Sequence, residues 1–191
     1  MKELCWLSLA LLVVGLAVWG GSQTAWAQAS TTTYFMHGYG SSAKAERQMT
    51  NYLVEQGISN TVVLVSVDRT GYATLHGSVG KNAVNPLVKV EFADSRNTDF
   101  HQDGQWLRAA IAEGQKVTHT KQINLVGHSM GNLTTLAYLN DNLSSAARPE
   151  VAHLVFLAGG LFEEMTTDVA GHLTKRLPAN LAVLNVYSTG D

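Results

Sequence analysis

From residue 32 to residue 187, short apolar runs rich in β-branched side chains alternate with longer amphipathic stretches. The short runs predict strands at 32–36, 61–67, 87–92, 122–126, 153–158 and 181–187, with a hairpin partner at 72–76. Amphipathic stretches predict three helices. The first follows Ser41 and Ser42, which would cap it, the second runs from Asp99 to just before Gly114, and the third covers 130–140. Strands that alternate with helices form a parallel sheet covered on both faces. We therefore expect an α/β fold with a doubly wound, mostly parallel sheet.

A further amphipathic stretch, residues 163–176, follows Gly159 and Gly160. It predicts a helix that either covers the site as a lid or lies on the surface as an ordinary helix.

The composition excludes several classes of protein. The 191 residues are 46% hydrophobic and 15% charged, which suffices for one domain with a sizeable core and is too apolar for intrinsic disorder. A formal net charge of −2 provides no basic field for phosphates, so we expect no nucleic-acid partner.

The N-terminus has the pattern of an export signal. An apolar run at 4–20 is followed by Ala25-Trp26-Ala27, which has the small-x-small form that signal peptidase recognises. We expect a signal peptide at 1–27, a mature domain at 28–191, and a secreted or cell-surface protein. An uncleaved membrane anchor is the alternative interpretation of the same run.

Thiol and metal chemistry are not expected. Cys5 is the one cysteine and lies in the signal segment, so the mature chain has no thiol. The seven histidines show no H-x-x-x-H spacing with an adjacent glutamate, so we expect no metal site and no cofactor.

The sequence Gly127-His128-Ser129-Met130-Gly131 lies between a predicted buried strand and a predicted helix. In this context G-x-S-x-G is typical of a nucleophile elbow, a sharp turn that holds a serine in a strained backbone conformation. Gly127 and Gly131 would remove side chains that collide with the strand and helix, and the Met130 N–H would stabilise an oxyanion. The alternative is that Ser129 only caps the helix.

A second oxyanion donor should follow an earlier strand. The segment His37-Gly38-Tyr39-Gly40 follows the strand predicted at 32–36, and we assign the backbone N–H of Tyr39 as that donor. His37 precedes the serine in the chain, whereas the order typical of this chemistry is serine, acid, histidine. We therefore expect His37, like Gly38 and His128, to support the loops.

These two motifs resemble those of the α/β-hydrolase superfamily. More narrowly, the chain resembles lipase-like cell-surface hydrolases of Gram-positive lactic bacteria, a family of unknown function. The resemblance implies hydrolysis of a carboxylic ester or related acyl bond, in a small or lipid-like substrate, through an acyl-Ser129 intermediate. The segments that carry it are 37–40, 67–77, 85–92, 106–107 and 124–131.

Members of that family carry an acid and then a histidine beyond the last predicted strand. Here Asp191 is either that acid or a solvated terminal residue. Downstream of Ser129, His153 opens a strand at the far end of the sheet and His172 lies in the helix predicted at 163–176. We therefore expect a domain truncated at its C-terminus, without a catalytic base and with poor activity.

Two other functions stay open. Gly38-Tyr39-Gly40-Ser41-Ser42-Ala43 fits the G-x-G-x-x-A turn of a dinucleotide-binding protein, with Asp68 as ribose ligand, although Asp68 lies further along the chain than is usual. The other is a non-catalytic surface or binding protein that retains the hydrolase fold.

Export predicts cleavage between Ala27 and Gln28. N-terminal sequencing of protein recovered from culture medium or cell wall should therefore begin at Gln28. A chain that begins at Met1 and partitions with membranes would instead support the anchor.

Overall fold

The computed structural model describes residues 31–142, 145, 148–158, 177 and 181–187. They form a seven-stranded sheet in the order β3-β2-β4-β1-β5-β6-β7. The strands are β1 (Thr32–Met36), β2 (Val62–Val67), β3 (Ala73–His76), β4 (Leu87–Phe92), β5 (Gln122–His128), β6 (Glu150–Leu157) and β7 (Ala182–Val186). The helices are α2 (Arg47–Glu55), α3 (Phe100–Thr118) and α4 (Met130–Asn142).

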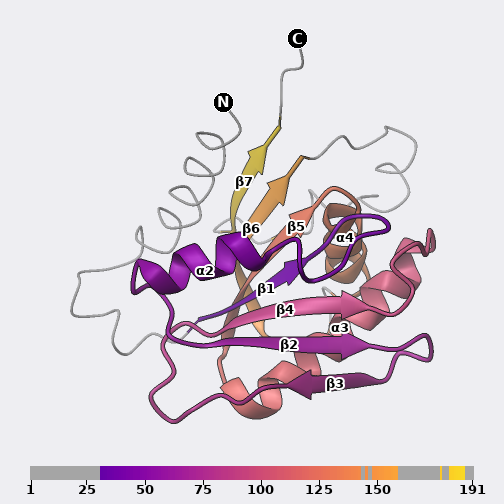
Figure 1. The fold of residues 1–191 in the computed structure, drawn as a ribbon. Helices are drawn as coiled ribbons and strands as arrows, with labels where there is room; N and C mark the ends of the chain where they lie inside the picture. The colour runs from indigo at the N-terminus through magenta and orange to yellow at the C-terminus, as the bar shows by residue number, and fades with distance from the viewer. Residues whose placement is uncertain (1–30, 143–144, 146–147, 159–176, 178–180, 188–191) are drawn as a thin grey trace.

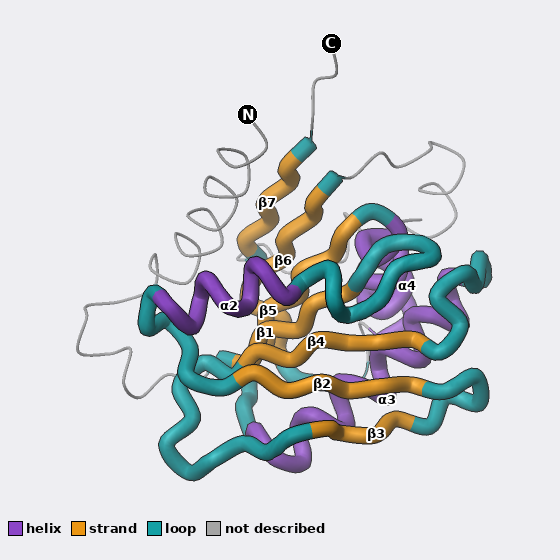
Figure 2. Tube along the Cα trace, viewed as in Figure 1, coloured by secondary structure: helices purple, strands orange, loops and turns teal. Residues whose placement is uncertain are grey.

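All neighbouring strands run parallel except β3, which forms an antiparallel hairpin with β2. Helix α2 lies on one face of the sheet, and α3 and α4 lie on the other (Figure 1; Figure 2). The doubly wound, mostly parallel α/β fold predicted from the sequence is confirmed. In such sheets, sites form where the carboxyl ends of the strands meet.

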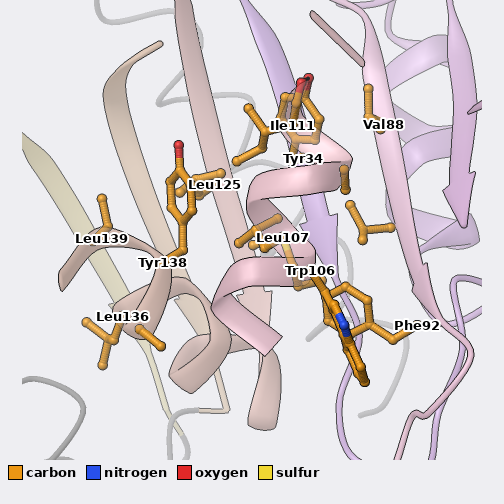
Figure 3. Close-up of a cluster of buried hydrophobic side chains, with 14 of the residues drawn as sticks. Tyr34, Val88, Phe92, Trp106, Leu107, Ile111, Leu125, Leu136, Tyr138 and Leu139 are labelled. Atoms are coloured by element: carbon orange, nitrogen blue, oxygen red, sulfur yellow. Dashed lines mark hydrogen bonds between the residues drawn. The ribbon is translucent and has the colours of Figure 1, made fainter. Parts of the chain in front are cut away.

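Each face of the sheet has its own apolar core. The larger core lies between the sheet and helices α3 and α4, and it contains Tyr34, Leu107, Leu125 and Tyr138 (Figure 3). The smaller core joins α2 to the opposite face through Met49 and Leu53. Because both faces are covered, the central strand β1 is buried along its whole length.

Helix α3 continues past Gly114, where the sequence predicted its end. A methyl group added at Gly114 would collide with the hydroxyl of Tyr34, which donates a hydrogen bond to the carbonyl of Ile111 (3.2 Å). Gly114 therefore allows close packing inside the helix. The helix ends at His119, whose left-handed backbone (φ 52°) forms the C-cap.

Two predicted element starts were also wrong. Helix α2 begins at Arg47 and not after Ser41 and Ser42, because residues 42–47 form successive turns and the Ala43 N–H donates to the Glu91 carboxylate (3.2 Å). Strand β6 begins at Glu150, three residues before His153, because its ladder with β5 extends to the pair Gln122 and Glu150.

The lid helix predicted at 163–176 lies outside the described residues. Among the helices that the structure describes, none has both the length and the apolar character needed to cross a membrane.

Two carboxyl groups are buried in this fold. Glu46 and Asp103 are 1% and 0% exposed, and each has one oxygen without a hydrogen-bond partner. Burial raises the pKa of each to about 7, opposed at Glu46 by the charge of Lys89 and at Asp103 by a hydrogen bond from the Asn97 amide. Both groups are therefore largely protonated in mildly acidic solution.

The folded state should lose stability as pH rises. The pKa values in the unfolded chain are 4.5 for Glu46 and 3.8 for Asp103. Because folding raises them, the contribution of each group to stability is fully present below these values and is lost as pH rises through about 7. Over that interval the loss of stability should be about 3 kcal/mol for Glu46 and about 4 kcal/mol for Asp103. In urea denaturation, Glu46→Gln should be more stable than the parent at pH 8 and similar at pH 5. The exposed Glu55→Gln on α2 is the control, and a Glu46→Gln profile parallel to the parent's would contradict the assignment.

Candidate active site

Ser129 lies at the carboxyl edge of the sheet, between the end of β5 and the start of α4. Its backbone is left-handed (φ 53°), which is unusual for a residue other than glycine. The Ser129 N–H donates to the Leu157 carbonyl (2.9 Å), and the Ser129 carbonyl accepts from the Asn132 N–H (3.0 Å). The residue is exposed. The strained turn expected from the sequence is therefore present, and it holds an accessible hydroxyl.

The two glycines of the motif allow backbone approaches that no side chain would tolerate. A methyl group at Gly131 would lie 2.5 Å from the Met36 carbonyl oxygen, and one at Gly127 would lie 2.6 Å from the Asn132 amide oxygen. Real side chains essentially never approach this closely. The steric reason given for both glycines from the sequence agrees with this geometry.

Asn132 supports the turn in a way that the sequence did not reveal. Its amide nitrogen donates to the Leu157 carbonyl (3.1 Å), the same oxygen that accepts the Ser129 N–H. The side chain is completely buried. Asn132 thus joins the first turn of α4 to the end of β6. Its position three residues after the serine is the one sequence feature from which this role could have been predicted.

The loop after β1 lies beside Ser129 because β1 and β5 are neighbours in the sheet. A methyl group at Gly38 would lie 3.3 Å from the Ser129 Cβ and 3.2 Å from the His128 Nδ1. The loop turns tightly, with the Ser41 N–H donating to the Gly38 carbonyl (3.1 Å). The two segments predicted to supply oxyanion donors, the loop after β1 and the turn at Ser129, are therefore adjacent in space.

The backbone N–H groups of Tyr39 and Met130 make no hydrogen bond to any residue that the structure describes. The Met130 N–H belongs to the first turn of α4, where helix geometry leaves such donors unpaired and the helix dipole favours negative charge. Within the part of the chain that the structure describes, both donors are therefore unpaired, as binding of an oxyanion would require.

His37 is held on both sides of its ring. Its Nδ1 bonds to the Gly38 carbonyl (2.9 Å), and its Nε2 accepts from the Phe92 N–H (3.3 Å), an arrangement that requires the neutral Nδ1–H tautomer. Burial lowers the pKa of His37, and the same cause lowers the pKa of the half-buried His128. These bonds suit the supporting role predicted for His37.

His153 is part of the β6 ladder. It does not open the strand, as the sequence suggested, but pairs with Asn124, whose side-chain oxygen lies 2.8 Å from its Nδ1. Asn124 precedes Ser129 by five residues of extended chain, roughly 16 Å. His153 is therefore out of reach of the serine, while His172 and Asp191 lie outside the described residues.

The dinucleotide alternative loses its structural context. Its glycine-rich turn should lead directly into a helix, yet α2 begins at Arg47, nine residues after Gly38. The Asp68 carboxylate accepts hydrogen bonds from the N–H groups of Thr70 and Tyr72 in its own turn. For metals, no group of three or more His, Cys, Asp or Glu side chains able to hold an ion occurs in the described part of the chain.

Comparison with known protein families identifies the chain. Residues 21–180 match the family described as alpha/beta hydrolase of unknown function (DUF915). The chain belongs to this family. No match was found among curated proteins.

Two solved structures of bacterial proteins share the fold. The lin2722 gene product of Listeria innocua is 22% identical, with a TM-score of 0.70 over 81% of this chain and 68% of that one. A protein described as a "putative cell surface hydrolase" from Lactobacillus plantarum WCFS1 is 21% identical, with a TM-score of 0.71 over 86% of this chain and 70% of that one. The likeness confirms the α/β-hydrolase fold.

The contact at Gly131 predicts a mutational effect. Gly131→Ala should lower the free energy of unfolding by about 2 kcal/mol or more, because the methyl group meets a backbone carbonyl that has little room to move. Urea denaturation measures the change. Gly80→Ala is the matched control, since a methyl group there would meet no atom within 4 Å. Equal stability of the two variants would disprove the close contact.

Proposed function

We propose that this protein is an exported serine hydrolase that acts on a carboxylic ester or related acyl bond through an acyl-Ser129 intermediate. The observation that carries the proposal is the left-handed backbone of an exposed Ser129 at the first turn of α4. A serine that only capped a helix would have no need of this strain, since a capping residue ordinarily has extended backbone angles.

The surrounding backbone suits acyl transfer. Ser129 Oγ would attack the carbonyl carbon and pass its proton to a base, while the carbonyl oxygen becomes an oxyanion between the Tyr39 and Met130 N–H groups. Collapse of this intermediate would break the bond to the protonated leaving group, and water would then release the acid by the same steps. We propose Asp191 as the acid that orients the base.

Export to the cell surface is part of the proposal. The pattern at 1–27 predicts a cleaved signal peptide, and the Lactobacillus plantarum protein is described as a cell surface hydrolase. The substrate would then be an acyl compound that is available outside the cytoplasm.

A non-catalytic surface or binding protein is the second candidate. It is favoured by one observation, which is that no imidazole or carboxylate of the described residues is hydrogen-bonded to the Ser129 hydroxyl. A serine without a neighbouring base is a weak nucleophile.

A fluorophosphonate probe separates the two candidates, because it reacts with activated serines. We expect slow labelling at one site, assigned to Ser129 by mass spectrometry, because the oxyanion donors stabilise the adduct even where no base is hydrogen-bonded to the serine. Ser129→Ala should remove this labelling. Any p-nitrophenyl ester hydrolysis should fall at least about a hundredfold in that variant. Ser66→Ala, on β2 and three strands from β5, is the control. An unlabelled parent protein, or full turnover by Ser129→Ala, would refute the proposal.

A further inference from the structure

Arg96 lies on the loop that supports the site. This loop, residues 93–99, follows β4, and its Ser95 carbonyl accepts the Gly40 N–H (2.7 Å). The Arg96 side chain runs along Gly40, since a methyl group there would lie 3.3 Å from its Nε and 3.9 Å from its Nη2. The left-handed Gly40 (φ 64°) leaves this space open. An exposed guanidinium is thus placed beside Gly40, the residue that follows Tyr39.

The same turn connects Arg96 to the serine. Ser129 contacts Gly38 at one end of the turn, and Arg96 contacts Gly40 at the other. Successive Cα atoms are about 3.8 Å apart, so these contacts limit the distance between Arg96 Nε and Ser129 Cβ to roughly 17 Å at most. An extended acyl compound is long enough to span this maximum distance.

The nearby acids are engaged elsewhere. Asp94 Oδ2 pairs with Arg69 (3.7 Å), and Asp94 Oδ1 accepts the Arg96 backbone N–H (3.4 Å). Asp99 caps α3, and Asp68 accepts bonds within its own turn. No carboxylate of a described residue lies within 4 Å of the Arg96 guanidinium. Among the residues described, Arg96 is therefore a cation without an ion-pair partner at the edge of the site.

We propose that Arg96 is a specificity-determining residue that binds an anionic group, carboxylate or phosphate, on the substrate of Ser129. The guanidinium presents a planar set of donors that matches both anions. This inference rests on the proposed function and narrows its substrate class to acyl compounds with a negative charge on the side of the Tyr39 turn.

The kinetic test compares pairs of esters that differ only in charge. Mono-(4-nitrophenyl) esters of dicarboxylic acids, from glutaric to dodecanedioic acid, place a free carboxylate at increasing distance from the ester, and the methyl-capped diester of each is neutral. The ratio of their kcat/KM values should fall about tenfold in Arg96→Gln, and part of it should return in Arg96→Lys. Arg108→Gln, at an exposed arginine on α3, should keep the parent's ratio. An unchanged ratio in Arg96→Gln would overturn the inference.

A binding test is independent of catalysis. Calorimetry with Ser129→Ala should show that monomethyl glutarate or propyl phosphate binds, and that adding Arg96→Gln weakens the preferred anion about tenfold. Whichever of the two ligands binds more tightly shows whether the site prefers a carboxylate or a phosphate. Ser129-dependent hydrolysis without an Arg96 effect in either test would overturn this inference alone. Absence of Ser129-dependent hydrolysis would refute the proposed function, and calorimetry would still decide on Arg96.

Discussion

Helix α4 begins against the backbone carbonyls of Met36 and His37, at an approach that only a glycine at position 131 allows. This contact brings the first turn of the helix onto the ends of β1 and β5. The chain between β5 and α4 is then so short that Ser129 must take a left-handed backbone to connect them. The strain at the serine is therefore a consequence of how closely helix and sheet pack.

The strain persists because several bonds converge on it. The Leu157 carbonyl accepts hydrogen bonds from both the Ser129 N–H and the Asn132 side chain, which joins the turn to β6. On the other side, His37 joins the loop after β1 to β4 through the Phe92 N–H. Groups held from two sides lose little further entropy when a substrate binds, which is the condition for preorganised oxyanion donors.

Loops from three strands form this edge of the molecule. The segment after β4 contacts the segment after β1 through Ser95 and Arg96. The turn after β2 contacts the segment after β4 through the ion pair of Arg69 and Asp94. Parallel strands place all these loops at the same edge, so residues far apart in the chain meet at the edge that carries Ser129. Sequence patterns gave no sign of Arg96, because an exposed arginine in a loop has no periodicity and no motif.

The sequence by itself determined the sheet, its doubly wound layers and the turn around Ser129. Apolar periodicity and close glycine spacing are local properties, so they can be recognised without knowing what packs against them. The prediction at Gly114 was wrong because a glycine that ends a helix and one that packs inside it look alike in the chain. The predicted starts of α2 and β6 were wrong because they depend on contacts with distant residues, Glu91 for α2 and the β5 ladder for β6. Only the tertiary structure decided that Tyr34 lies against Gly114, that Glu91 holds the Ala43 N–H, and that Arg96 lies beside Gly40. These contacts join residues separated by tens of positions, and it is the strand order that brings them together.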